Sequence, residues 1–290
     1  MPNFRFSFLS AKDLPQVRET FLKAFADYVV PVQLTEEQLR DKVEREGIVA
    51  EFCVAAFVGD EMVGFILTAL GEWQGKPTAY NAGTGVVPQH RGHGLTQKMY
   101  AFLLPKLRAS SVELALLEVI HNNLPALHSY ERLGFRVTRT LNCYRAINED
   151  ILLPAEAPAG IAIAPLAQAE VEKYTIFRDV RPSWQNATAA LLRAQEQCHT
   201  FAARNQGQEV IGYVSVFTKN GAVAQLAVAE NWRGKGVGSA LLRKAIAHTT
   251  APALMFLNIE DTAQSMISFL QRRHFRLLLK QYEMQRAVVA

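Results

Sequence analysis

Cysteine is scarce in this 290-residue sequence, which contains only Cys53, Cys143 and Cys198. Three widely separated cysteines form neither a metal-ligand set nor a disulfide scaffold, so we expect reduced thiols, no metal and a cytoplasmic location. No uninterrupted apolar run approaches roughly 18 residues, and the N-terminus lacks a basic segment followed by a long apolar core. These absences argue against a membrane partner and favour a soluble, unexported protein.

A strong excess of one charge is also absent. The net charge is +4, with 16 basic and 17 acidic residues in the first 150 positions and 15 and 10 in the remainder. A bias this mild suits phosphate-containing ligands and is too weak to predict a nucleic-acid partner. The 49% of hydrophobic residues is ordinary for a globular chain, and the length is sufficient for two medium-sized domains.

The order of predicted elements occurs twice. In the first half, two helical patterns, the second capped by Thr35, precede an antiparallel run of strands that ends in a glycine loop. The second half repeats this order with a strand at 160–166, two helical stretches around Pro182, three strands and another glycine loop. We therefore predict domains at 1–152 and 160–290, separated where Pro154, Pro158 and Gly160 interrupt both periodicities.

The two glycine loops align without gaps. "VVPQHRGHGLTQKMY", residues 86–100, faces "VAENWRGKGVGSALL", residues 228–242, so that Arg91, Gly92 and Gly94 match Arg233, Gly234 and Gly236. A strand that ends in such a loop and opens a helix presents backbone N–H groups at the positive end of a helix dipole, which suits phosphate. An ordinary strand-to-helix turn is the alternative, and neither loop has the ending of a Walker motif.

The loops resemble the Arg/Gln-x-x-Gly-x-Gly/Ala motif of the GCN-five-related N-acetyltransferases, the GNAT superfamily, and the duplication makes the chain similar to a tandem member. The resemblance implies an α+β fold of two tandem GNAT-like domains, each a mostly antiparallel, splayed mixed sheet flanked by helices. It also implies acetyl-CoA as co-substrate, held by Thr84, Gly85, Val86, Val87, Arg91, Gly92, His93, Gly94, Leu95, Thr96 and Asn123 in the first half and by Arg233, Gly234, Lys235, Gly236, Val237 and Gly238 in the second.

The first loop departs from the family pattern at Thr96, which takes the place of Gly238. Its β-branched side chain could hold the helix away from its neighbours, its hydroxyl could reach a phosphate oxygen, or it could satisfy local backbone groups. His93 faces Lys235, so a titratable group replaces a permanent cation.

A second motif follows the first loop in "LALLEVIHNNLPALHSYERLGF". Its spacing resembles the protein N-terminal acetyltransferase branch, which implies that Glu118 accepts the proton of the incoming amine, Tyr130 protonates the departing thiolate and Asn123 contacts pantetheine. Alternatively, Glu118 is a solvated strand residue and Tyr130 a core ring.

In the second half, the corresponding segment places Leu270, Ala263 and His274 where the first half has Tyr130, Asn123 and Gly134. No phenol is available there, so we expect catalysis in the first half and a supporting or second CoA-binding role for the second.

The resemblance places the acceptor opposite CoA, with Tyr28, Glu72, Trp73, Tyr80 and Asn81 as candidate contacts. Aromatic residues at such positions can also simply close the core. The predicted activity is acetyl transfer to a primary amine, on a small molecule or a peptide N-terminus, by direct attack. A non-catalytic acyl-CoA sensor or scaffold is the alternative, and the chain could form a homodimer.

Overall fold

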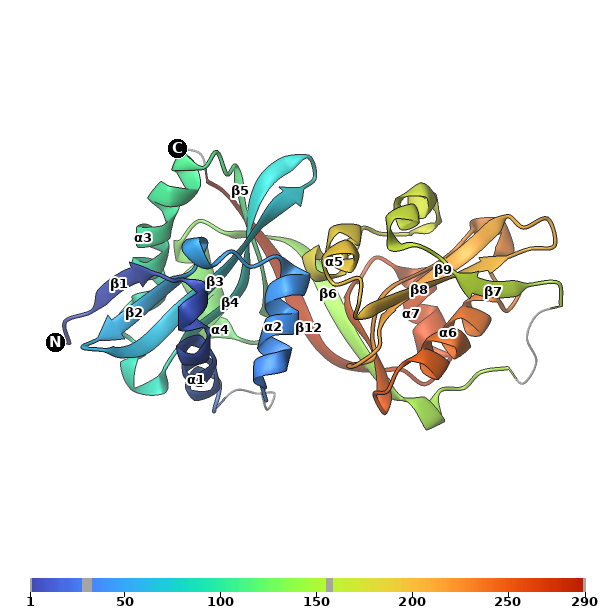
Figure 1. Cartoon of the computed structure of the whole chain (residues 1–290), viewed down its shortest axis with the longest axis horizontal. Helices are drawn as coiled ribbons and strands as arrows, with labels where there is room; N and C mark the ends of the chain where they lie inside the picture. Colours follow the sequence, from blue (N-terminus) through green and yellow to red (C-terminus); the bar gives the residue numbers. More distant parts are fainter. Residues whose placement is uncertain (1, 28–32, 155–158, 289–290) are drawn as a thin grey trace. The chain divides into compact units, whose positions relative to one another are not determined.

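The computed structural model describes residues 2–27, 33–154 and 159–288 (Figure 1). The chain divides into an N-terminal unit, Met1–Thr138 with Tyr282–Ala290, and a C-terminal unit, Arg139–Gln281. This division differs from the predicted one at 152 and 160. The predicted domains each keep their own final strand. The compact units instead assign residues 139–152 to the C-terminal unit and residues 282–290 to the N-terminal unit.

The N-terminal unit places a six-stranded sheet between helices. The strand order is β1-β2-β3-β4-β5-β12, antiparallel from β1 to β4 and parallel between β4 and β5. The strands are β1 (Arg5–Phe8), β2 (Val54–Val58), β3 (Glu61–Trp73), β4 (Lys76–Val86), β5 (Leu114–Ile120) and, from residue 282 on, β12 (Arg276–Ala287). The helices are α1 (Leu14–Ala24), α2 (Glu36–Glu46), α3 (Leu95–Ala109) and α4 (Leu124–Arg132).

The start of α2 illustrates how local sequence determines an element. The Thr35 hydroxyl accepts the Gln38 N–H at 3.1 Å, and the Gln38 side chain accepts the Thr35 N–H at 2.9 Å. This reciprocal cap satisfies two backbone donors that the first helical turn leaves unpaired. The predicted cap at Thr35 is confirmed, and Gly47 ends the helix in the left-handed conformation with φ 76°.

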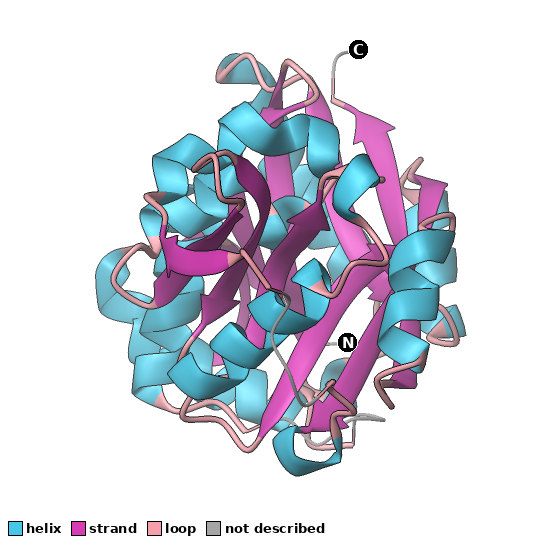
Figure 2. Cartoon of the chain, turned by 90° about the vertical axis from the view of Figure 1, so that its right-hand side faces the viewer, coloured by secondary structure: helices cyan, strands magenta, loops and turns pink. Residues whose placement is uncertain are grey.

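The C-terminal unit repeats this plan with the strand order β6-β11-β10-β9-β8-β7. The strands are β6 (Arg136–Ile147, in this unit from residue 139), β7 (Ala162–Pro165), β8 (Cys198–Arg204), β9 (Val210–Phe217), β10 (Ala222–Val228) and β11 (Ala253–Glu260). The helices are α5 (Thr188–Arg193), α6 (Val237–His248) and α7 (Gln264–Gln271). Figure 2 shows the mixture of helices and strands that makes the fold α+β and confirms the predicted class.

The predicted helices on either side of Pro182 are mostly not α-helices. The segment Gln168–Phe177 forms 3₁₀ turns interrupted at Tyr174, Trp184–Asn186 forms another, and only Thr188–Arg193 is α-helical. Proline lacks an N–H donor and restricts the residue before it, so a continuous helix through this region is disfavoured.

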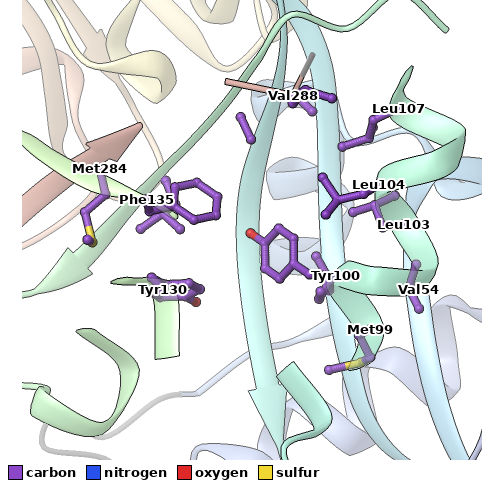
Figure 3. Packing of buried hydrophobic residues seen from close by; sticks show 14 of the residues in the cluster. Val54, Met99, Tyr100, Leu103, Leu104, Leu107, Tyr130, Phe135, Met284 and Val288 are labelled. Carbon is purple, nitrogen blue, oxygen red and sulfur yellow. The ribbon is translucent and has the colours of Figure 1, made fainter. Parts of the chain in front are cut away.

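Each unit is completed by a strand from the other half of the sequence. Residues 282–288 bring Met284 and Val288 into the core of the N-terminal unit, and the Val288 N–H donates to the Glu113 carbonyl at 2.9 Å (Figure 3). Conversely, β6 pairs with β11 and contributes Tyr144 and Ala146 to the core of the C-terminal unit. The final strands are therefore exchanged.

Helix α3 supplies the centre of the N-terminal core. Its fully buried residues Met99, Leu103 and Leu107 face the sheet, and Tyr100 lies between them and the Tyr130 and Phe135 rings (Figure 3). Within the described residues, no helix is long and apolar enough to cross a membrane.

Candidate functional site

A β-bulge marks the point where β4 and β5 separate. In the register of β3 with β4, Leu67 faces Gly83 and Thr68 faces Asn81, so Ala82 is the extra residue. The parallel register of β4 with β5 begins at Thr78 and covers 78–81 and 114–117. Beyond it, the described residues of the two strands make no further ladder pairs, and β4 backbone groups after the bulge are left without partners on β5.

Asn81 stabilises this bulge. Its amide nitrogen donates to the hydroxyls of Thr84 and Tyr100, each at 2.8 Å, and its amide oxygen accepts the Gly83 N–H at 3.0 Å. The amide is therefore used within the protein on the α3 face of the sheet. These bonds give Asn81 a part in shaping β4, and its predicted contact with the acceptor stays a prediction.

Tyr80 lies on the opposite face, next to Glu118. The Tyr80 hydroxyl donates to the Glu118 carboxylate, and the tyrosine is almost fully buried. Burial, and then the nearby carboxylates of Glu118 and Glu46, raise the pKa of the Tyr80 phenol well above its usual value. The phenol therefore remains a proton donor to Glu118, which stands one residue beyond the last paired position of β5.

The buried Glu46 at the end of α2 is near this pair and is itself neutralised. Lys42 donates to both Glu46 carboxylate oxygens, at 2.7 and 2.8 Å, and Arg45 contacts the same group at 3.3 Å. These cations offset the Glu46 charge, so Glu118 and Glu46 can both stand near Tyr80 without an uncompensated pair of negative charges.

A phenol cluster lies on the α3 face at the same level of the sheet. Tyr100 and Tyr130 meet edge to face with ring centroids 6.4 Å apart, and Figure 3 shows both rings within the core cluster. Burial, and then the neighbouring Tyr130 phenol, raise the pKa of Tyr100. Successive strand residues point to opposite faces of a sheet. Tyr80 therefore shares one face with Glu118, and Asn81 shares the other face with Tyr100 and Tyr130.

The glycine loop connects β4 to α3 with two left-handed residues. Gly92 has φ 80° and Gly94 has φ 66°, and an added Cβ at Gly92 would meet nothing within 4 Å. The space above the loop is therefore open, and the first-turn N–H groups of α3 face it without intrahelical partners. The His93 Nδ1 lies 3.0 Å from the Arg91 carbonyl, which requires a proton on Nδ1.

Arg91 ties this loop to α1. Its guanidinium binds Asp27 through two bonds of 2.6 and 2.8 Å and donates to the carbonyls of Ala24 at 2.9 Å and Val86 at 3.2 Å. The hydrogen bond with Asp27 raises the pKa of Arg91 and lowers that of Asp27. The arginine was predicted as a phosphate-binding cation, and the structure adds a tether that the sequence did not reveal.

The C-terminal unit repeats both the strand bulge and the arginine tether of the glycine loop. In β10 the register with β9 skips Ala224, which matches the bulge at Ala82. Arg233 repeats the tether, with Asp179 at 2.7 Å and the carbonyls of Phe177 and Val228 each at 3.0 Å. The duplicated loops are therefore held in the same way.

A cavity of about 210 Å³ lies at the second glycine loop. Gly234, Gly236 and Gly238 line it together with the facing parts of β10 and β11. The residues matching Tyr80 and Tyr130 are Ala222 and Leu270, so this cavity lacks both phenols.

The structure explains the different residues at Thr96 and Gly238. A Cβ at Gly238 would lie 2.8 Å from Cε2 of Phe269, so only glycine fits there without displacement of the ring. The residue corresponding to Phe269 in α4 is Ser129, whose smaller side chain leaves room for threonine. In the second repeat the small residue is Gly238 on α6, opposite Phe269. In the first repeat it is Ser129 on α4, opposite Thr96.

The remaining predicted site residues are dispersed. Asn123 caps α4, its side chain accepting the Ala126 N–H at 3.3 Å. Trp73 is buried at the end of the β3–β4 hairpin, whereas Glu72 is exposed. Tyr28 lies outside the described residues. Within those residues, no group of three or more His, Cys, Asp and Glu side chains is arranged to hold a metal.

Comparison with known proteins identifies the family of this doubled site. The profile of the acetyltransferase (GNAT) family matches residues 14–135 and again 165–275. The chain belongs to the GNAT acetyltransferase family. Each unit is thus a GNAT domain, and the predicted tandem arrangement is confirmed.

Solved structures of the same fold cover the whole chain. A GCN5-related N-acetyltransferase from Sphaerobacter thermophilus matches 99% of this chain and 96% of its own, at 17% identity and a TM-score of 0.74. A tandem GNAT protein from the clavulanic acid biosynthesis pathway, solved without AcCoA, matches 99% of both chains at 16% identity and 0.74. A GCN5-related N-acetyltransferase from Kribbella flavida covers 99% of this chain and 71% of its own, at 16% and 0.62. No curated protein matches the sequence significantly.

Proposed function

We propose that the N-terminal unit transfers an acetyl group from acetyl-CoA to a primary amine by direct attack. One observation carries the proposal: Glu118 and Tyr130 lie on opposite faces of the sheet where β4 and β5 part. A proton acceptor and a proton donor on either side of one opening suit a reaction in which an amine loses a proton and a thiolate gains one.

The residues of this unit fit acetyl-CoA. The left-handed Gly92 and Gly94 keep side chains away from the amide groups that open α3, which favours a diphosphate there. The β4 residues after the bulge, from Gly83 to Val86, offer backbone groups that β5 does not use. When bound, acetyl-CoA supplies the activated thioester.

The proposed chemistry needs no covalent enzyme intermediate. The amine nitrogen forms a bond to the acetyl carbon while the carbon–sulfur bond breaks. Glu118 takes the proton from nitrogen, directly or through water, and Tyr130 gives a proton to sulfur. Tyr80 is a positioning residue, because its hydroxyl donates to Glu118 and fixes that carboxylate.

Single substitutions test this assignment. We expect Tyr130→Phe and Glu118→Gln each to lower kcat by roughly a hundredfold while acetyl-CoA affinity is preserved, because each removes a proton-transfer group. Thiol release with a panel of amines gives kcat, and calorimetry gives the affinity. Tyr213→Phe in the C-terminal unit is the matched control, since it removes a buried phenol hydroxyl from β9 and should leave turnover unchanged. Equal turnover of Tyr130→Phe and the unmodified protein across pH would remove Tyr130 from the mechanism.

A second function is favoured for the C-terminal unit. Its cavity combines the glycine loop with an absence of counterparts to Tyr80 and Tyr130. This combination suits an acyl-CoA site without turnover. Tight acetyl-CoA binding alongside no thiol release with any amine would make the whole chain a sensor rather than an enzyme.

A further inference from the structure

The cavity at the second glycine loop is lined by an excess of positive charge. Among the described residues of its lining, five are arginines and one is acidic, namely Arg178, Arg181, Arg233, Arg272, Arg273 and Asp179. The carboxylate of Asp179 is already paired with Arg233 at 2.7 Å, so it does not offset the other four cations. The lining therefore favours an anionic ligand.

One end of this charge suits the diphosphate of CoA. Arg233 belongs to the glycine loop, and Arg273 donates to the Ser239 hydroxyl in the first turn of α6 at 2.6 Å. Both arginines thus lie at the end of the cavity where the free N–H groups of α6 favour phosphate.

Arg178 lies on the face of the sheet away from α6. Its Nε donates to the Tyr213 hydroxyl at 2.6 Å. Tyr213 belongs to the same core cluster as Val171, whereas the next residue, Val214, packs in the cluster that contains Leu241 of α6. Since successive strand residues point to opposite faces, the Tyr213 side chain points away from α6. The Arg178 cation is therefore separate from those at the glycine loop.

A chain of buried hydrogen bonds holds Arg178 in place. The Tyr213 hydroxyl donates to the Gln225 side-chain oxygen at 2.9 Å, and the Gln225 nitrogen donates to the Asn186 carbonyl at 2.7 Å. These three residues are at most 5% exposed, and they line the cavity together with Arg178. The guanidinium is thus fixed at the cavity wall before a ligand binds, which lowers the entropic cost of binding.

The charge of Arg178 is only partly offset within the protein. The Glu172 carboxylate is 3.6 Å from Nη2, beyond hydrogen-bond distance, and the Glu172 side chain is 56% exposed, whereas that of Arg178 is 14% exposed. Nη2 also donates to the Thr188 hydroxyl at 3.3 Å. Within the described residues no hydrogen bond involves Nη1, so its two N–H donors are available to an anion in the cavity.

The N-terminal unit has no cation at the position of Arg178. The tethering arginine of each glycine loop donates to a carbonyl earlier in the chain, that of Ala24 in the N-terminal unit and that of Phe177 in the C-terminal unit. The residue that follows this carbonyl is Phe25 in the first unit and Arg178 in the second. An aromatic ring thus stands in one repeat where the other has a guanidinium.

The residue that holds Arg178 differs in the same way. Tyr213 pairs with the third residue after the bulge in β10, and Phe65 pairs with the third residue after the bulge in β4. Phe65 has no hydroxyl to accept a guanidinium N–H, and it stacks on Phe21 with ring centroids 5.6 Å apart. The fold therefore does not require a charge at this place, and the Arg178–Tyr213 pair belongs to the C-terminal unit alone.

The geometry points to a carboxylate-binding site at Arg178, in the C-terminal cavity on the face of the sheet away from α6. The inference rests on the acyl-CoA site proposed for that unit. The carboxylate is either the distal end of a dicarboxylic acyl group on CoA or a separate carboxylic acid bound beside CoA. In both cases its oxygens accept the N–H groups of Nη1, because guanidinium and carboxylate match in geometry and charge.

The experiment measures the affinity of the full chain for CoA thioesters that differ only at the end of the acyl group. Succinyl-CoA and glutaryl-CoA carry a carboxylate where butyryl-CoA and valeryl-CoA carry a methyl group. Calorimetry is performed on the unmodified protein, on Arg178→Gln and Arg178→Lys, and on the matched control Arg204→Gln, which removes an arginine of the same unit outside the cavity lining. Thermal unfolding verifies that each variant folds.

We expect at least one carboxylate-bearing thioester to bind roughly tenfold or more tightly than its methyl counterpart, the gain from one hydrogen bond to a charged group. Arg178→Gln should abolish this preference, which assigns it to the C-terminal cavity. Arg178→Lys should keep part of it, because the charge remains and the planar fork is lost. Arg204→Gln should keep all of it. A preference that persists in folded Arg178→Gln would overturn the inference.

Equal affinities of the paired thioesters would exclude the acyl group as the source of the carboxylate. The separate acid is then tested by ligand-observed NMR of CoA-loaded protein with butyrate and with butyramide, its neutral counterpart. Binding of butyrate alone that is lost in Arg178→Gln supports a separate carboxylic acid. Absence of butyrate binding, or binding that Arg178→Gln leaves unaltered, refutes the carboxylate site.

Failure of the proposed functions gives different results. Thiol release measures acetyl transfer in the N-terminal unit, so its absence leaves a thioester preference that depends on Arg178 intact. If no CoA thioester binds the protein, the acyl-CoA site is wrong, and butyrate is then titrated without CoA. Butyrate binding that is lost in Arg178→Gln still supports the carboxylate site, and its absence rules the site out.

Discussion

The pairing of Gly238 with Phe269 can be tested by adding the side chain that the first repeat has. In Gly238→Thr, the new Cβ would stand 2.8 Å from Cε2 and 3.2 Å from Cζ of Phe269, against a carbon contact of about 3.5–4.0 Å. The ring cannot move freely, because the Arg273 guanidinium lies 3.8 Å from its centroid. Such overpacking costs about 1–3 kcal/mol of unfolding free energy.

The assay is a double-mutant cycle in urea. We expect Gly238→Thr to lower the unfolding midpoint, Phe269→Ser to lower it by opening a space, and the double variant to recover part of both losses. The recovery should amount to about 1–2 kcal/mol of coupling, within the range for residues in direct contact. Thr96→Gly is the control in the other repeat, where the glycine replaces a helical residue opposite Ser129 and should cost at most about 1 kcal/mol. An unaltered midpoint for Gly238→Thr, or losses that simply add, would refute the reasoning.

Two further predictions concern charge and burial. Arg91→Ala should weaken acetyl-CoA binding by roughly tenfold in calorimetry, which is the loss expected for one hydrogen bond to a charged group. The reason is that the glycine loop loses its tether to Asp27 and the Ala24 carbonyl. Unchanged affinity would show that the tether is dispensable. Burial raises the pKa of the Cys53 thiol to about 12, from 9.0, so the unfolded chain ionises first as pH rises and this contribution to stability is lost between those values. Native Cys53 should therefore resist alkylation at pH 9 and react after denaturation, and rapid labelling of the folded protein would contradict its burial.

Local patterns in the sequence predict the elements that depend on local contacts. The cap at Thr35 and the loops containing Gly92 and Gly94 follow from short-range rules about backbone donors and left-handed residues, and the structure contains them. The alignment of the two loops also predicts the tandem family, because two copies of the motif are stronger evidence than one. Only the segment around Pro182 was wrong in kind, since helical spacing does not distinguish an α-helix from successive 3₁₀ turns.

The candidate site depends on contacts that the sequence separates. Tyr80 and Glu118 were both predicted, but as parts of different subsites, and only the sheet shows that one donates a hydrogen bond to the other. Asn81 follows Tyr80 directly, yet strand alternation sends it to the other face. Arg91 belongs to a motif that implies phosphate binding, whereas its ion pair with Asp27 joins residues that are far apart in the sequence.

The strand exchange links synthesis of the chain to completion of its catalytic candidate. The segment that supplies Met284 and Val288 to the N-terminal core follows the C-terminal unit in the sequence, so a ribosome has produced residues 139–281 before the N-terminal sheet can gain its sixth strand. A premature stop anywhere in the second repeat therefore also deprives the first of its finishing strand. The N-terminal GNAT domain is therefore whole only after the C-terminal one has been translated, whereas residues 139–281 already include the strands β6 to β11 of the C-terminal unit.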